Sequence, residues 1–530
     1  MNWDYIIIGG GSAGCVLASR LSEDENCRVL LLEAGPKDSN PWIHIPLGYG
    51  KLFNHPRLNW RFRSEPEPGL ENRVINQPRG RVLGGSSSIN GLLYIRGQQE
   101  DFDIWARAAG NRGWDYQDML TWFRKSEDQQ HGANQWHGEG GPLAVSDPSE
   151  PHELCDAWIA AGQQAGYRST SDFNGESQEG VGYYQSTMRR GRRCSAAAAY
   201  LTPRVCRRPN LTIETNAMAR KVVFDGKRAS GVEYDQAGSR KTANTSGEII
   251  LSAGAIGTPQ LLELSGIGCG ERLKGLGLKV VHDNPQVGEN FQDHLQVRFV
   301  YKSKKAITFN DDMRNPLRMA KVGLKYALTR KGPLTVSAGY AGGFFRSDAA
   351  RDERMDIQCL FITFSTNKMG DQLHPFSGFT VSACPLRPTS RGHVHAVSPD
   401  PEEAPAILAN FLGTQSDQLE VVAGMKVIRG VMAQPAMAPY IESEFIPGPE
   451  ISDQASMLAY ARETAGSIYH ASCTAALGKV VDGSLRVIGV DGLRVADASI
   501  MPSVVSGNTN AAVIAIGEKA ADMIRTDRKG

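Results

Sequence analysis

Three glycines near the start of the chain, Gly9, Gly11 and Gly14, have the G-x-G-x-x-G spacing of a phosphate-binding turn. The first allows a tight turn, the second lets backbone N–H groups approach a pyrophosphate, and the third lets a helix pack close to a strand. Glu33 follows Gly14 by 19 residues. A carboxylate there accepts hydrogen bonds from ribose hydroxyls and repels a 2′-phosphate, so the pattern predicts FAD or NAD rather than NADP.

Two strands and a helix must position these residues. The apolar run at 5–8 is typical of a buried parallel strand, and a second run at 29–32 ends at Glu33. A helix expected over 13–21 would point its positive N-terminal end at the phosphates. Because strand, loop, helix, strand and acid occur in order, we expect an α/β fold with a Rossmann-like unit.

Composition limits the other possibilities. The chain has 530 residues, is 41% hydrophobic, and carries 58 basic and 57 acidic residues, so it can bury a large core in two or more lobes. Its charge balance gives no indication of nucleic acid as a partner. Nine cysteines without a C-x-x-C pair are expected to be mostly reduced and structural. With no room for a signal peptide before Asp4 and no apolar run of about 18 residues, we expect a soluble cytoplasmic protein.

A second glycine-rich segment, P-R-G-R-V-L-G-G-S-S-S-I-N-G over 78–91, places hydroxyls and an Asn beside glycines. Such a loop can wrap a polar ligand with backbone amides. Together with the first motif it resembles the glucose-methanol-choline (GMC) family of FAD oxidoreductases, and the resemblance extends over nearly the whole chain. Within the family the likeness is greatest to bacterial flavin-dependent alcohol dehydrogenases and to choline dehydrogenase.

The resemblance implies two lobes. A discontinuous FAD-binding domain would comprise 1–155, 195–295 and 466–530. An α+β substrate-binding lobe with an antiparallel sheet would comprise 156–194 and 296–465.

The resemblance also implies the residues around FAD. Ile89 stands where some members carry a histidine that binds FAD covalently, so FAD is expected to be noncovalent. The implied cofactor-binding residues are Gly9, Gly11, Ser12, Ala13, Gly14, Glu33, Ala34, Arg81, Gly84, Gly85, Ser86, Asn90, Gly91, Leu93, Ala219, Ala253, Asp497, Ala498, Asn510 and Ala511.

The family's C-terminal signature implies a catalytic pair, His470 and Asn508. Asn508 is reached by counting back nine residues from Gly517. The chain departs from the family's usual residues at Ala471, Ser472, Cys473 and Ala512. These departures alter the stiffness of the loop and the local pocket wall, and so bear on the substrate and the rate rather than on the role of His470.

The chemistry of the pair can be stated from the residues. Alcohol oxidation removes a proton from oxygen and a hydride from carbon, and flavin N5 accepts only the hydride. Neutral imidazole, with an unperturbed pKa near 6.5, is a competent base, and an Asn amide can orient the same oxygen. We therefore expect oxidation of a primary alcohol or polyol, with electrons passing to a quinone or another carrier. The alternatives are an oxidase that uses O2, a lyase or photoenzyme, and a flavoprotein that only binds a partner.

Three features leave alternatives open. His294 has a type suited to catalysis, but a structural hinge is the preferred interpretation. His393 and His395 share one face of an expected strand, where an ordinary surface strand is preferred to a metal site because no third ligand is apparent. No metal is expected elsewhere.

The third feature is the segment 314–331, which has six cations and no acid. As a helix it could dock on an anionic membrane surface, giving a peripheral contact at the inner membrane. A solvated basic face above a buried apolar face is the preferred alternative.

Overall fold

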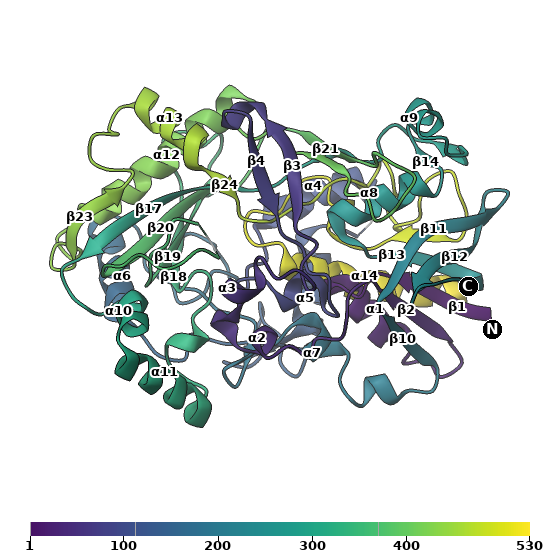
Figure 1. Cartoon of the computed structure of the whole chain (residues 1–530), viewed down its shortest axis with the longest axis horizontal. Coiled ribbons are helices and arrows are strands. Elements are labelled where there is room, and N and C mark those ends of the chain that lie inside the picture. The colour runs from purple at the N-terminus through teal and green to yellow at the C-terminus, as the bar shows by residue number, and fades with distance from the viewer. Residues whose placement is uncertain (1, 112, 369, 530) are drawn as a thin grey trace.

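The apolar runs around the glycine motif form the centre of a seven-stranded sheet (Figure 1). The structure is a computed structural model that describes residues 2–111, 113–368 and 370–529. β1 (Asn2–Ile8) lies parallel to β2 (Val29–Glu33) on one side and to β13 (Ser239–Leu251) on the other. The strand order is β10-β2-β1-β13-β12-β11, and β25 also pairs with β13. The other strands of this sheet are β10 (Leu211–Thr215), β11 (Ala217–Asp225), β12 (Arg228–Gln236) and β25 (Leu493–Val495).

Helices pack on this sheet and on each other. α1 (Ser12–Leu21) lies against the C-terminal helix α14 (Asn510–Lys529). A Cβ at Gly517 would lie 3.1 Å from the Ala13 Cα, so glycine permits the close crossing. Further helices around this sheet and beside it are α4 (Gln99–Ala108), α5 (Tyr116–Ser126), α7 (Ala196–Tyr200), α8 (Gly254–Leu264) and α9 (Gly270–Gly275).

A second seven-stranded sheet lies at the other end of the molecule (Figure 1). All its pairings are antiparallel, in the order β23-β17-β20-β19-β18-β7, and β24 also pairs with β17. α6, α12 and α13 pack against it. These elements are β7 (Gly180–Tyr183), β17 (Leu295–Ser303), β18 (Ala341–Phe345), β19 (Ile357–Ile362), β20 (Gly378–Pro385), β23 (Ile441–Ile446), β24 (Gly466–Ser467), α6 (Glu153–Gln164), α12 (Gln415–Met432) and α13 (Gln454–Thr464).

Smaller elements complete the two lobes and the region between them. The hairpin of β3 (Phe62–Glu67) and β4 (Arg73–Gln77) crosses this middle region (Figure 1). The α/β fold with an antiparallel second lobe is as predicted, but β24 places residue 466 inside the second sheet, so the exact lobe boundaries stay a prediction. The remaining elements are α2 (Pro41–His44), α3 (Tyr49–Leu52), β5 (Glu127–Gln129), β6 (Leu143–Val145), β8 (Met188–Arg189), β9 (Arg192–Arg193), β14 (Ile267–Gly268), β15 (His282–Asp283), β16 (Glu289–Phe291), β21 (Gly392–His395), β22 (Ala406–Leu408), α10 (Phe309–Arg314), α11 (Pro316–Thr329), and the 3-10 helices η1 (Pro46–Gly48), η2 (Pro68–Leu70), η3 (Gly85–Ser88), η4 (Val205–Arg207), η5 (Pro333–Thr335) and η6 (Ala498–Ile500).

The segment 314–331 does not have the buried apolar face that the sequence analysis preferred for it. It contains the whole of α11, but the predicted buried apolar face is wrong, because Tyr326 is the only buried residue of that helix. Leucines of α11 are among the most exposed large apolar side chains that the structure describes. Within the described part of the chain, no helix has both the length and the apolar character needed to cross a membrane.

The preferred interpretation of a surface strand is also wrong for His395. His395 is buried, with Nδ1 2.9 Å from Glu263 Oε1 and Nε2 3.0 Å from Glu289 Oε1. Arg272 completes this charged cluster by pairing with Glu263 at 3.3 Å. The described residues contain no group of three or more His, Cys, Asp or Glu side chains arranged to hold a metal ion.

Candidate functional site

A cavity of about 730 Å³ extends from the glycine motif of the first sheet to the wall made by the second. Its volume is within the range of small-molecule and cofactor sites. Both predicted catalytic residues line it. All of the predicted cofactor residues line it as well, except for Gly14, Gly84 and Ala511.

The glycine motif is shaped by its own backbone. Gly9 has φ of 101°, and a Cβ at Gly14 would lie 1.9 Å from the Gly9 carbonyl oxygen, so neither position accepts a side chain. At Gly11 the nearest neighbour of a Cβ would be 3.8 Å away, because this residue faces the cavity. A Cβ at Gly85 in the second glycine-rich loop would lie 2.7 Å from the Gly11 Cα. The two loops therefore form a small-residue cradle at the start of α1, which suits a pyrophosphate.

Glu33 closes one end of this cradle. Its Oε2 accepts a hydrogen bond from the Gly10 N–H at 2.9 Å, and its Oε1 accepts one from the Gly35 N–H at 2.7 Å. Burial raises the pKa of Glu33 to about 7. Further along, the Ser12 hydroxyl donates to Asn510 Oδ1 at 2.8 Å at the start of α14. Glycine cradle, terminal carboxylate and long cavity together fit a dinucleotide such as FAD.

Asp497 lines the cavity, but its carboxylate binds the protein. Oδ2 accepts hydrogen bonds from the Gly254 N–H at 2.9 Å and from the Thr258 hydroxyl at 2.6 Å. Oδ1 accepts one from the Ser499 N–H at 2.8 Å. Its carboxylate therefore holds the start of α8 against η6.

His470 lies at the other end of the cavity, on a loop that Asp293 anchors. The His470 N–H donates to Asp293 Oδ1 at 2.7 Å. Asp293 Oδ2 accepts from Gln77 Nε2 at 2.9 Å and from the Ser467 hydroxyl at 2.5 Å. One carboxylate thereby joins β4, β24 and the loop that carries His470.

The hydrogen bonds around His470 determine which of its nitrogens is basic. His294 Nε2 lies 2.8 Å from the Leu386 carbonyl oxygen, which can only accept, so this nitrogen carries the proton. In neutral His294, Nδ1 is then an acceptor, and it lies 2.8 Å from His470 Nδ1. His470 must therefore carry its proton on Nδ1 and present an unprotonated Nε2. From the sequence, a hinge was preferred to a catalytic role for His294, and nothing indicated this contact.

Asn508 lies at the basic nitrogen. Its Nδ2 donates to His470 Nε2 at 3.1 Å. Its Oδ1 accepts from Gln358 Nε2 at 3.2 Å, which fixes the orientation of the amide. Gln358 is buried in β19 of the second sheet and was not identified from the sequence.

The pKa of His470 is well below its usual value of 6.5, because the ring is buried and because His294 and Arg79 are close. Burial also lowers the pKa of His294. Both rings are thus neutral at pH 7, as the tautomer assignment requires.

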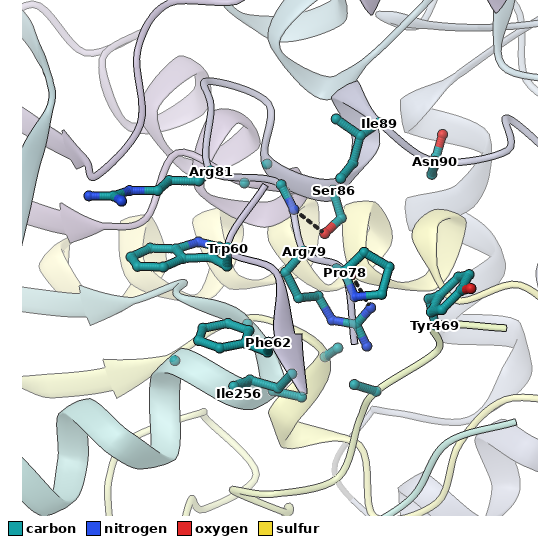
Figure 2. Close-up of a pocket in the computed structure, with 18 of the residues that line it drawn as sticks. Trp60, Phe62, Pro78, Arg79, Arg81, Ser86, Ile89, Asn90, Ile256 and Tyr469 are labelled. Atoms are coloured by element: carbon teal, nitrogen blue, oxygen red, sulfur yellow. Dashed lines mark hydrogen bonds between the residues drawn. The ribbon is translucent and has the colours of Figure 1, made fainter. Parts of the chain in front are cut away.

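Several cavity residues carried no sequence signal. Trp60 and Phe62 stack with ring centroids 5.5 Å apart, and the Arg81 guanidinium lies 4.7 Å from the centre of Trp60. Figure 2 shows Arg79 between this aromatic pair and Tyr469. Arg79 belongs to the glycine-rich loop over 78–91, which could have drawn attention to it. The aromatic residues come from irregular or hairpin segments without a periodic pattern.

Comparison with known proteins gives a consistent result. Two models described as GMC oxidoreductase match residues 3–296 and 388–517. An alcohol dehydrogenase (acceptor) of Pseudomonas putida is 43% identical, over 98% of this chain and 95% of that protein. The mitochondrial choline dehydrogenase of Mus musculus is 42% identical, over 99% of this chain and 89% of that protein.

Among solved structures, a pyridoxine 4-oxidase from Mesorbium loti superposes with a TM-score of 0.89 and 31% identity, covering 100% of both chains. A formate oxidase superposes with a TM-score of 0.92 and 27% identity, covering 100% of this chain and 99% of that one. These matches and the site geometry agree with the predicted FAD-dependent alcohol oxidation. The chain belongs to the GMC oxidoreductase family and is an enzyme that acts on CH–OH groups.

Proposed function

We propose that the enzyme oxidises a neutral primary alcohol or polyol to the carbonyl product, with His470 as the general base and Asn508 as the group that orients the substrate oxygen. The observation that carries this proposal is the hydrogen-bonded row His294–His470–Asn508 at the end of the cavity. It leaves one unprotonated nitrogen beside one amide donor.

Each protein group has a defined task. FAD, when bound, supplies N5 as the acceptor of the hydride. The cradle at Gly11 and Gly85 and the carboxylate of Glu33 would hold its phosphate and ribose parts. When the alcohol binds, its hydroxyl replaces the Asn508 amide at His470 Nε2, and this nitrogen accepts the hydroxyl proton. The Asn508 amide then donates to the alcohol oxygen, so that one C–H bond points at the ring.

FAD is noncovalent in this proposal. Ile89 lines the cavity and its side chain has no nucleophile. Acid or heat precipitation of the purified protein should release intact FAD into the supernatant. Flavin fluorescence that stays with the precipitated polypeptide would overturn this part of the proposal.

The cavity charges favour a neutral substrate over a cation. Arg79 and Arg298 line the cavity near Tyr469, and burial lowers the pKa of each guanidinium. Neither forms an ion pair among the described residues. Four described acids line the cavity: Glu33, Glu402, Glu403 and Asp497. The carboxylates of Glu33 and Asp497 accept hydrogen bonds from the protein, and Glu403 lies at α8, where its backbone carbonyl accepts from Gln260 Nε2.

Two nearly isosteric alcohols test this point. Choline carries a quaternary ammonium, whereas 3,3-dimethylbutan-1-ol has the same shape without the charge. We expect the neutral alcohol to reduce the flavin with the higher kcat/KM, because the two arginines repel the cation. A clear preference for choline would contradict the neutral-substrate proposal.

The electron acceptor is proposed to be a quinone or another carrier. A cytoplasmic enzyme with a peripheral contact over residues 314–331 at the inner membrane would reach a quinone dissolved there. The reduced enzyme should then be reoxidised faster by a soluble quinone than by air-saturated buffer. Faster reoxidation by O2 would indicate an oxidase, and no dark reduction by any alcohol would favour a lyase or photoenzyme.

A further inference from the structure

α11 exposes a stripe of leucines. Leu317, Leu324 and Leu328 are spaced by seven and four residues and so share one face of the helix. They are 83%, 61% and 76% exposed. Because Tyr326 packs against the protein on another face, this stripe points away from the body of the molecule. In Figure 1, α11 lies at the lower edge of the second lobe.

Cations border the leucine stripe. Lys321 lies within one helical turn of both Leu317 and Leu324, and it makes no hydrogen bond or ion pair among the described residues. On the adjoining side, the Arg318 guanidinium donates to the Ala306 carbonyl oxygen at 3.0 Å. Lys325 pairs with Glu150 at 2.6 Å. α11 itself contains no acid.

A second basic segment joins this surface. The Tyr326 hydroxyl donates to the Gly191 carbonyl oxygen at 3.1 Å, in the turn between β8 and β9. A Cβ at Gly191 would lie 1.9 Å from the Arg330 carbonyl oxygen, so the turn lies directly against the end of the helix. Arg190 and Arg192 flank that glycine and are exposed, as are Arg330 and Lys331. Segments far apart in sequence therefore form one basic rim at the C-terminal end of α11, where the Arg330 guanidinium lies 5.0 Å from the centre of the Tyr326 ring.

We propose that this surface, α11 with the turn 190–192, docks the enzyme on an anionic lipid bilayer. The leucines enter the boundary between headgroups and acyl chains, and the cations face the lipid phosphates. The occupant is a bilayer rather than a second copy of the chain, because a two-fold contact would place this basic rim against itself. The proposal rests on the proposed function only in its purpose, which is access to a membrane-dissolved quinone.

The surface is connected to the cavity through a short stretch of chain. η5 (Pro333–Thr335) follows α11 and contacts η1 (Pro46–Gly48), which leads into α3. Tyr49 of α3 and Ala338 after η5 both line the cavity. Docking through α11 would therefore place this wall of the cavity toward the membrane.

Vesicle flotation of the purified holoenzyme tests the proposal. We expect binding to phosphatidylcholine vesicles that contain phosphatidylglycerol, weak binding to phosphatidylcholine alone, and loss of binding at high salt. The variant Leu317→Ser/Leu324→Ser/Leu328→Ser should bind the anionic vesicles at least about tenfold more weakly. The variant Lys321→Glu/Arg190→Glu should bind them about 25-fold more weakly, because each cation near the surface contributes roughly a factor of five to the affinity. The reversed charges should add to this loss. Leu419→Ser and Ile488→Ser remove exposed apolar side chains elsewhere and should bind like the parent enzyme.

Absence of binding to the anionic vesicles, or equal binding by the parent and both surface variants, would overturn the proposal. So would a parent dimer that the triple leucine variant dissociates, because that result assigns the stripe to a second copy. All variants should keep dark flavin reduction by a soluble alcohol. Failure of that reaction in the parent enzyme counts against the proposed function, while vesicle binding remains a separate measurement.

Discussion

Removing the His294 ring tests the tautomer assignment at His470. In His294→Ala the His470 Nδ1–H loses its acceptor, at present 2.8 Å away in a fully buried site. An unpaired buried donor costs about 1–3 kcal/mol. The preference for the Nδ1–H tautomer falls by the same amount relative to the tautomer with its proton on Nε2, which presents no base to the substrate. We therefore expect hydride transfer to slow by about 10- to 100-fold, since about 1.4 kcal/mol corresponds to a factor of ten.

His294→Asn is the matched control. Its amide oxygen can accept from His470 Nδ1, so most of the rate should return even though the bond to the Leu386 carbonyl is lost. The assay is anaerobic stopped-flow reduction of the flavin at saturating alcohol, expressed per bound FAD, with a melting temperature for each variant. If His294→Ala reduces its flavin at the parent rate, or if Ala and Asn are equally slow at equal FAD content, the tautomer argument is wrong.

The remaining predictions concern the cofactor end, the asparagines and pH. Glu33→Ala should weaken FAD retention by about 10- to 100-fold, because charge-assisted hydrogen bonds contribute about 1.5–3 kcal/mol. Glu33→Gln should lose less of its FAD affinity. Full FAD occupancy of Glu33→Ala with selective loss of turnover would contradict the assignment. Asn508→Ala should slow flavin reduction while Asn510→Ala mainly loosens FAD, and the reverse pattern would move the catalytic role to Asn510. Because burial lowers the pKa of His294 and His470, the unfolded chain binds protons more readily at these sites. Their contribution to the free energy of unfolding is therefore fully present above about pH 6.5 and lost as pH falls below it, and replacing both rings should flatten that acid-side slope in urea titrations.

The parts of the structure that follow from local pattern were predictable from the sequence. The strands β1 and β2, the helix α1 and the motif between them depend on apolar runs and glycine spacing, so short stretches of sequence determine them. The resemblance placed His470 and Asn508, which the fold brings within hydrogen-bond distance. The cofactor contacts remain predictions.

Contacts between distant segments could not be predicted in the same way. His294 meets His470 across 176 residues, and Gln358 meets Asn508 across 150. No local periodicity encodes such pairs. The leucines of α11 show that a local pattern can also mislead. Their amphipathic spacing predicted a buried face, but in the structure Tyr326 is the only buried residue of that helix. His395 was misjudged because its acidic neighbours come from other segments of the chain.

The central claim is that His470 removes the proton when an alcohol reduces the flavin. The most direct measurement is anaerobic reduction in the dark, across pH, for the parent enzyme and for His470→Ala. The account predicts a parent rate that is flat near pH 7 and falls on the acid side, where the lowered pKa of His470 lies. It predicts a variant that keeps FAD, reduces it about 10²–10⁴-fold more slowly, and lacks the acid-side fall. A variant that bleaches its flavin at the parent rate, with the same pH profile, would contradict the account.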